Sequence, residues 1–219
     1  MQAANRCGLF PSNTYLSDDT NTFVTERFDI LEDGTKLGYE DFTVLNRSEN
    51  DANAKYRGSY EHLLNQTYRY TNSLAEVERM YRYIVFSCLI GNGDAHLKNF
   101  ALMYPPDRSA VFVSPPFDIT HTLIYPELPE EMALKIKGSR SFPQLSGLLE
   151  LAEGKVFRIR RAKQIVESLA EGILEYLRHS NEVQLLNGLR ESIESSVSYT
   201  MAREPTKRRY SHLKQRKYQ

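Results

Sequence analysis

The sequence has 219 residues, of which 41% are hydrophobic and 26% charged, enough for one sizeable core or a core with a small lobe. No run reaches the roughly 18 apolar residues that a membrane helix needs. The polar start at residues 1–5 is unlike a signal peptide. We therefore expect a cytoplasmic protein with no membrane partner. With only two cysteines, Cys7 and Cys88, the chain has no disulfide framework.

The formal net charge of zero conceals an uneven distribution. Residues 203–219 hold seven of the 28 basic residues and one of the 28 acidic residues, so residues 1–202 carry 21 basic and 27 acidic side chains. A basic tail of this kind can contact nucleic acid or an acidic partner. The simpler interpretation is a solvated, disordered end, and we predict a basic, disordered tail over residues 203–219.

Near the start, the sequence predicts a short β-hairpin. Residues 14–16 and 22–28 are rich in β-branched and aromatic side chains, and residues 17–21 between them are typical of a turn. The Asp33-Gly34 pair predicts a second reversal soon after. Residues 1–8 are expected to be the end of a helix that stops at Gly8, and the rest of the first 45 residues to be extended chain and turns.

Helical patterns begin at residue 59. Ser59 can cap a first helix with Tyr60, Leu63, Leu64 and Thr67 on its inner face. Ser73 with Glu76 forms a capping-box pattern at the start of a second helix. Apolar residues of the second pattern recur every three or four positions as far as Leu89, which is typical of a long helix with a buried face. The glycines of residues 91–93 end this helix and free the backbone for unusual dihedral angles.

Beyond the glycines, strands return briefly. Residues 101–104 and 110–113 predict a second short hairpin, and helical periodicity returns from residue 142, over residues 156–177 and more weakly over residues 183–197. These patterns together predict an α+β protein that is mostly helical.

The loop after the long helical pattern concentrates polar chemistry. Asp94, His96, Lys98 and Asn99 fall within six positions, and Asp118 follows Asp94 by 24 residues. Protein kinases use this order for a catalytic Asp, a metal-binding Asn and a metal-binding Asp. Asp94 would accept the proton of the attacking hydroxyl, while Asn99 and Asp118 offer the oxygen ligands that Mg²⁺ prefers. His96 or Lys98 could face the transferred phosphate, and we rank His96 first because kinases often place a cation two residues after the catalytic Asp.

Residues 89–100 closely resemble the catalytic loop of HipA-like serine/threonine kinases, the toxins of bacterial toxin–antitoxin systems. Residues 26–29 are similar to the hinge of that family, residues 55–61 to the stretch that leads into its helical lobe, and residues 114–119 to its metal-aspartate segment. The resemblance covers roughly residues 5–180. It implies a protein-kinase-like fold, with ATP and Mg²⁺ as cofactors and a protein Ser or Thr as the acceptor.

The resemblance also implies roles for individual residues. Asp94 becomes the catalytic aspartate, Asn99 and Asp118 bind magnesium, and Glu26 and Phe28 line the base of the nucleotide. His96 and Lys98 belong to the same catalytic loop.

The family resemblance divides the chain into three segments. Residues 1–45 would be a remnant of the N-lobe strands and the hinge, residues 46–202 the helical C-lobe, and residues 203–219 the tail. A family member also has a phosphate-covering loop and a nucleotide-binding lysine, but no Gly-rich loop precedes Glu26 and no lysine precedes Lys36. We therefore expect either a toxin-type kinase completed by a separate N-lobe-like or antitoxin chain, or a truncated remnant. Contact with nucleic acid is expected only through an antitoxin.

Two other functions fit parts of the sequence. The chain could be a catalytically inactive module that binds an antitoxin or a substrate. It could also be a metal-dependent phosphoesterase, since residues 94–96 and the nearby His121 resemble the first ligands of a two-metal site. The second alternative is disfavoured because such enzymes need a later Asn-His pair, which the sequence lacks.

Overall fold

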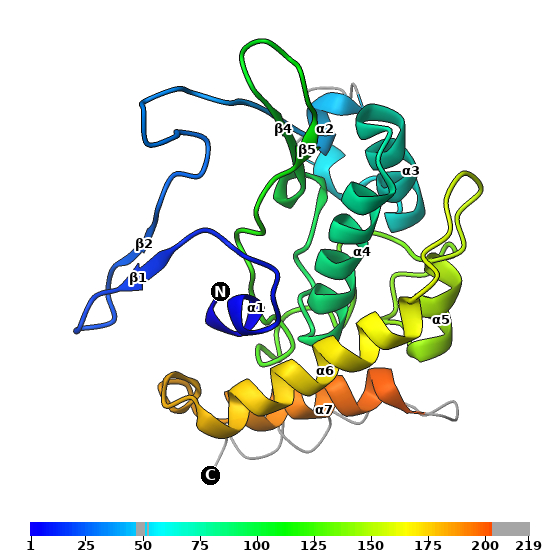
Figure 1. Ribbon diagram of the computed structural model, residues 1–219. Helices are drawn as coiled ribbons and strands as arrows, with labels where there is room; N and C mark the ends of the chain where they lie inside the picture. The colour runs from blue at the N-terminus through cyan, green and yellow to red at the C-terminus, as the bar shows by residue number, and fades with distance from the viewer. Residues whose placement is uncertain (47–50, 52, 203–219) are drawn as a thin grey trace.

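The computed structural model describes residues 1–46, 51 and 53–202 and shows a mixed α+β fold that is mostly helical (Figure 1). The helices are α1 (Gln2–Arg6), α2 (Phe42–Leu45), α3 (Tyr60–Thr71), α4 (Leu74–Leu89), α5 (Leu145–Leu151), α6 (Ala162–His179) and α7 (Leu189–Met201). Three short 3₁₀ helices are η1 (Ala54–Tyr56), η2 (Leu97–Asn99) and η3 (Glu182–Gln184). The predicted tail, residues 203–219, lies outside the described residues, and the division near residue 45 remains a prediction.

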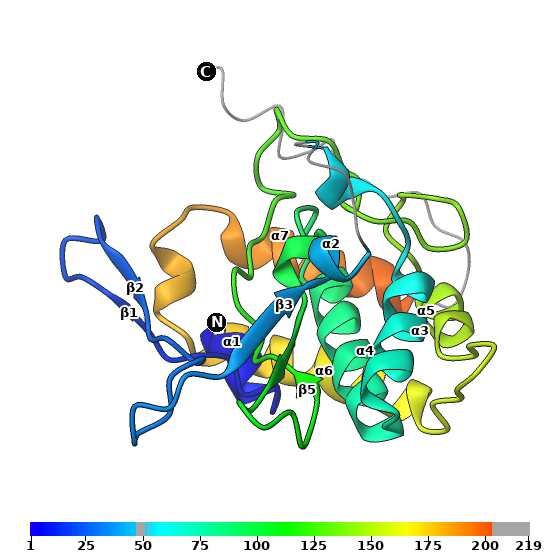
Figure 2. The ribbon, with the colours of Figure 1, turned by 90° about the horizontal axis from the view of Figure 1, so that it is seen from above.

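Two small antiparallel sheets accompany the helices. Strands β1 (Thr14–Leu16) and β2 (Phe23–Thr25) form a hairpin that projects from the helical body in both views (Figures 1 and 2). Strands β3 (Gly38–Asp41), β4 (Ala101–Tyr104) and β5 (Phe112–Val113) form a sheet in that order. Both predicted hairpins are confirmed, and β3 is an additional strand that the sequence did not predict.

Helix α4 is the centre of the core. From Met80 to Leu89 nearly every side chain of this helix is buried, because α3 covers one flank, the β3–β5 sheet lies beside it, and α6 and α7 cross its end (Figure 1). The predicted inner face of α3 is confirmed as well, since its buried residues are Tyr60, Leu63, Leu64 and Thr67. This packing fixes the point at which α4 releases the polar loop.

The predicted helix caps are present, with one difference. The Ser59 hydroxyl accepts a hydrogen bond from the His62 N–H, and the Ser73 hydroxyl accepts one from the Glu76 N–H. The Glu76 carboxylate, however, does not complete a capping box. It accepts a hydrogen bond of 2.6 Å from the Val113 N–H of β5 instead, so the start of α4 is joined to the sheet.

The third long helix begins later than its sequence pattern predicts. Residues 156–161 are not helical, and α6 starts at Ala162, so the predicted start at residue 156 is wrong. Phe157 and Ile159 are buried in the turn that precedes the helix, and the Phe157 ring lies against Gly154 so closely that an added Cβ would approach it to 2.5 Å. Their apolar character therefore reflects burial of a turn. No helix in the described ranges is long and apolar enough to cross a membrane.

Candidate active site

The loop that follows α4 is held in shape by the side chain of Asn92. This residue is 2% exposed, and its Oδ1 accepts hydrogen bonds of 3.0 Å from both the Asp94 N–H and the Thr120 hydroxyl. Gly91 makes the turn out of the helix with a φ of +72°. A residue with a side chain adopts this backbone conformation only with strain. Asn92 thus ties the segment that carries Asp94 to the segment that carries Asp118.

Thr122 forms a second tie between the same segments. The Gly93 N–H donates to Thr122 Oγ1 at 2.8 Å, and the Thr122 N–H donates to the Gly91 carbonyl at 3.2 Å. A Cβ at position 93 would lie 2.6 Å from the Glu131 carbonyl oxygen and from Thr122 Oγ1. A backbone carbonyl can move only at a large cost in energy, so this close approach requires glycine at position 93. The backbone directly before Asp94 is therefore held between Glu131 and Thr122.

Two buried tyrosines hold the loop from behind. The Tyr60 hydroxyl of α3 donates to the Ala95 carbonyl at 2.9 Å, and the Tyr83 hydroxyl of α4 donates to the Phe117 carbonyl at 2.6 Å. Burial raises the pKa of both phenols well above the ordinary value, so both remain neutral donors. The helical core thereby positions the residues next to the two aspartates.

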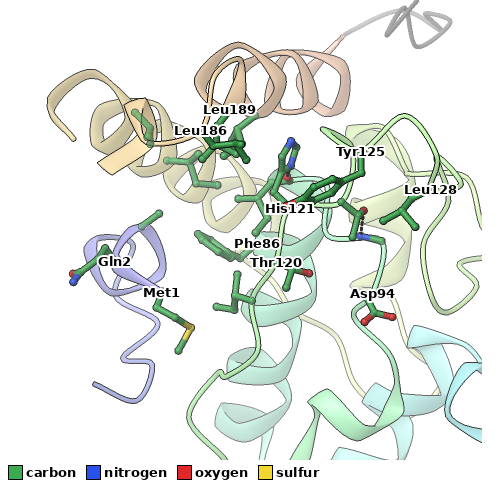
Figure 3. Close-up of a pocket in the computed structure, with 18 of the residues that line it drawn as sticks. Met1, Gln2, Phe86, Asp94, Thr120, His121, Tyr125, Leu128, Leu186 and Leu189 are labelled. Carbon is green, nitrogen blue, oxygen red and sulfur yellow. Dashed lines mark hydrogen bonds between the residues drawn. The ribbon is translucent and has the colours of Figure 1, made fainter. Parts of the chain in front are cut away.

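Asp94 has one engaged and one available carboxylate oxygen. The Tyr56 hydroxyl donates to Oδ1 at 3.0 Å, whereas no described residue donates a hydrogen bond to Oδ2. Asp94 forms part of the wall of a cavity of about 1070 Å³ whose other residues are mainly apolar, among them Phe86, Tyr125 and Leu128 (Figure 3). A ligand in this cavity would therefore reach the carboxylate.

His96 and Lys98 have different environments. His96 is 6% exposed, and its Nε2 lies 2.8 Å from Lys55 Nζ. Burial lowers the pKa of His96, and the Lys55 ammonium lowers it further, although the nearby Asp94 carboxylate opposes both effects. The lowered pKa favours the neutral imidazole. The Lys98 side chain is exposed and makes no hydrogen bond or ion pair with any described residue.

Asn99 and Asp118 are brought into direct contact. The Asn99 Nδ2–H donates to Asp118 Oδ2 at 2.6 Å, and Asn99 Oδ1 accepts from the His96 N–H at 2.9 Å. Asp118 is exposed and has a φ of +52°, which is uncommon for a residue other than glycine and recurs at functional sites.

This pair fits Mg²⁺ by the chemistry of its donors. One carboxylate and one carboxamide suit an ion that keeps several waters and takes further oxygens from phosphate. The Asp118 Oδ1 has no donor among the described residues, and a rotation of the Asn99 amide would turn its oxygen toward Asp118. No group of three or more His, Cys, Asp or Glu side chains in the described chain could hold a metal ion by itself.

Phe28 and Glu26 are the two residues predicted to line the nucleotide base. Phe28 lies beside Phe117, the residue before Asp118. Its ring centroid is 5.5 Å from that of Phe117 and 6.1 Å from that of Tyr39. Burial, with smaller contributions from nearby carboxylates, raises the pKa of Tyr39 to about 12. Glu26 is exposed just after β2, and its carboxylate accepts a hydrogen bond of 2.7 Å from Asn13 Nδ2. The aromatic cluster therefore joins the segment predicted to be the hinge to the segment that bears Asp118.

Several residues of the site were missed by reasoning from the sequence. Lys55 and Tyr56 lie in a stretch that resembles the family, but no local pattern connects them to Asp94, which is 38 residues from Tyr56. In the sequence Asn92 is typical of a turn, and only the structure shows the two hydrogen bonds that its side chain accepts. A polar residue between two glycines was the only local signal for it.

His121 has a structural role. Its Nδ1 bonds to the Ile90 carbonyl at the end of α4, and its Nε2 bonds to Ser192 Oγ on α7. Both ring nitrogens are therefore engaged, and they are not available as the metal ligand that a phosphoesterase site would require.

Comparison with known sequences gives one family. The model of the HipA-like C-terminal domain matches residues 1–177. The protein named "Putative kinase Y4dM" of Sinorhizobium fredii is 36% identical over 122 residues, which make up 55% of this chain and 29% of that protein. Y4mE of the same organism, described in the same words, is 27% identical over 107 residues, 46% of this chain and 25% of that protein. The match thus spans less than a third of these relatives' length.

Comparison with solved structures gives the same fold. HipA of Shewanella oneidensis MR-1, solved with HipB and operator DNA, superposes with a TM-score of 0.67 at 14% identity, over 90% of this chain and 53% of that chain. The proinflammatory kinase CtkA of Helicobacter pylori superposes with a TM-score of 0.55 at 12% identity, over 91% of this chain and 79% of that chain. The predicted kinase-like α+β fold of the HipA type is therefore confirmed.

Proposed function

Because the chain belongs to the HipA-like C-terminal domain family, we propose that it carries the phosphoryl-transfer site of an ATP-dependent serine/threonine kinase. The observation that supports this most strongly is the joint placement of Asp94, Asn99 and Asp118. Asn92 and Thr122 hold the Asp94 loop against the segment that bears Asp118, and Asn99 bonds directly to Asp118. Phosphoryl transfer depends mainly on such positioning and on neutralising charge.

Asp94 acts as the base for the acceptor hydroxyl. Its Oδ2 is free to accept the proton, while the Tyr56 hydroxyl holds Oδ1 in place. The cavity beside Asp94 provides a path by which the Ser or Thr of a protein substrate reaches this oxygen.

ATP would bind next to the pair formed by Asn99 and Asp118. Phe28 offers an aromatic face to the base, in line with its expected role beside Glu26 at the hinge. Asn99 and Asp118 would hold Mg²⁺, which would supply neutralisation of the triphosphate charge. ATP as the donor agrees with the cytoplasmic location that we expect for the protein.

The partner that we propose is a protein chain. HipA of S. oneidensis was solved with HipB and operator DNA, and by analogy the present chain would act as a toxin component with an antitoxin. An N-lobe-like element, on this protein or on another chain, would cover the phosphates. Nucleic acid would be reached only through the antitoxin.

Transfer of radioactive phosphate from γ-labelled ATP to protein, followed in the presence of Mg²⁺, tests the proposal. The wild-type protein, with its N-lobe-like partner where one is encoded beside it, should label serine or threonine. Asp94→Asn should abolish labelling but leave ATP binding intact, and Asp18→Asn, at an exposed position in the β1–β2 turn, is the matched control. Equal labelling by the wild type and Asp94→Asn would exclude the proposed mechanism.

A second candidate is a non-catalytic module that binds proteins. It is favoured by the large apolar side chains that line the cavity while remaining exposed: Tyr125, Leu128, Leu185 and Leu186. It predicts that Asp94→Ala changes neither partner binding nor any growth phenotype. Loss of growth inhibition in that variant would argue against it.

A further inference from the structure

Lys55 is a half-buried cation that faces the active-site loop without an acidic partner. Its Nζ lies 2.8 Å from His96 Nε2 and 4.8 Å from the centroid of the Tyr56 ring. No carboxylate in the described part of the chain forms an ion pair with it. Partly burying a charge is costly unless an opposite charge compensates it, so the position of Lys55 suits a site that receives an anion.

With Lys55 as an ammonium group, the contact with His96 allows only one hydrogen-bond arrangement. An ammonium group can only donate, so Nε2 of His96 must accept, and the ring proton resides on Nδ1. The imidazole is then neutral, and its buried Nδ1 has no hydrogen-bond partner among the described residues. The cation at this side of the loop is therefore Lys55, supported by His96.

The short helix η1 is attached to the site at two adjacent positions. Lys55 contacts His96, and the next residue, Tyr56, donates to Asp94 Oδ1 at 3.0 Å. The backbone of η1 is held in turn, because Arg140 Nη2 donates to the Tyr56 carbonyl at 2.9 Å. Two adjacent residues of η1 thus hold it against the loop that carries Asp94 and His96.

We propose, on the basis of the kinase function above, that Lys55 is a catalytic residue that binds the transferred phosphoryl group. In the reaction, the bond from the γ-phosphorus to the bridging oxygen of ADP breaks as the bond to the acceptor hydroxyl oxygen forms. The hydroxyl proton passes to Asp94, and Lys55 keeps its protons and donates one hydrogen bond to an equatorial phosphate oxygen. His96 positions Lys55 and does not itself contact the phosphate.

Removing the charge should slow the chemical step more than it weakens nucleotide binding. Loss of one preorganised donor to a developing charge reduces kcat by about 100-fold in well-studied sites, and we expect a fall of this order for Lys55→Met. Lys55→Arg keeps a cation and should recover part of the activity, although its geometry differs. Lys155→Met, which removes an exposed lysine in the turn before α6, away from the Asp94 loop, is the matched control and should behave like the wild type.

The experiment measures kcat and the KM for ATP of the wild type and these variants, with thermal unfolding as a check on folding. For His96, glutamine can still accept a hydrogen bond and should preserve more activity than leucine. This pair tests the proposal independently should Lys55→Met prove unstable.

The possible outcomes are distinct. If the wild type and Asp94→Asn differ but Lys55→Met has a kcat within threefold of the wild type, the role of Lys55 is refuted and the proposed kinase function stands. A raised KM for ATP with an unchanged kcat would also refute it, because Lys55 would then bind the nucleotide equally in the ground state. Absence of transfer by the wild-type protein would overturn the kinase function and this role together.

Discussion

Replacing Thr122 by valine should loosen the loop that carries Asp94 without changing the shape of the side chain. The hydroxyl accepts a hydrogen bond from the Gly93 N–H at 2.8 Å and donates one to the Gly91 carbonyl at 3.2 Å. Valine leaves the partly buried Gly93 N–H without a partner, so the expected loss of stability is about 1–3 kcal/mol. For a chain of this size the melting temperature should fall by roughly 3–10 °C.

The same substitution should lower kcat, because Asp94 follows Gly93 directly. A loss of about 1.4 kcal/mol in transition-state positioning corresponds to roughly a tenfold lower rate. Thermal unfolding followed by circular dichroism gives the stability, and phosphate transfer gives the rate. Thr122→Ser keeps the hydroxyl and serves as the control. Neutral surface substitutions usually change the free energy of unfolding by no more than about 0.5 kcal/mol. If the free energy of unfolding of Thr122→Val lay within this range of both Thr122→Ser and the wild type, the claim that this hydroxyl fixes the loop would be wrong.

Three further predictions concern single contacts. Tyr56→Phe should lower kcat about tenfold in steady-state kinetics, because it removes the hydrogen bond to the Asp94 carboxylate. Such a bond contributes roughly 1.5–3 kcal/mol, and solvent replaces part of this in the variant. Burial raises the pKa of Cys7 to about 11, so iodoacetamide at pH 8 should alkylate it far more slowly in the folded than in the unfolded protein, as peptide mass spectrometry can show. Glu76→Ala should destabilise the fold by about 1–3 kcal/mol in urea unfolding, because it removes the acceptor of the Val113 N–H.

The Cys7 prediction has a definite sign in the dependence of stability on pH. The folded protein holds the thiol proton more tightly than the unfolded chain, whose pKa is near 9.0, so this contribution is present at neutral pH and is lost as the pH rises from about 9 to about 11. Rapid alkylation of folded protein at pH 8 would contradict it. For Glu76, Arg79→Ala is a useful control, because it removes the exposed ion-pair partner but leaves the bond to Val113.

Local sequence signals were sufficient for much of the helical lobe. The caps at Ser59 and Ser73 and the spacing of apolar residues along α3 and α4 are properties of short windows, and the structure confirms them. The same reasoning failed before α6, where Phe157 and Ile159 continue a helical spacing although they are buried in a turn. Periodicity records which residues are buried, and it cannot identify the backbone conformation that buries them.

The candidate active-site loop could be proposed from the sequence because its polar residues lie close together in the chain. Asp94 and Asn99 lie in one short segment, so their spacing alone indicated a kinase-type site. The contacts that orient them are long-range, such as that of Lys55 with His96, 41 positions apart, and that of Tyr83 with Phe117, 34 positions apart. No local pattern encodes such pairs, which arise only when η1 and α4 are folded against the loop.

The central claim is that Asp94 accepts the proton of a protein hydroxyl as the γ-phosphate of ATP is transferred. The most direct measurement is single-turnover transfer from MgATP to a Ser- or Thr-containing protein, with the wild type compared with Asp94→Asn at equal nucleotide occupancy. We predict that the wild type forms phosphoserine or phosphothreonine and that Asp94→Asn binds MgATP with similar affinity but transfers at least 100-fold more slowly, as expected for loss of a general base. Equal transfer rates for the two proteins under these conditions would contradict the account.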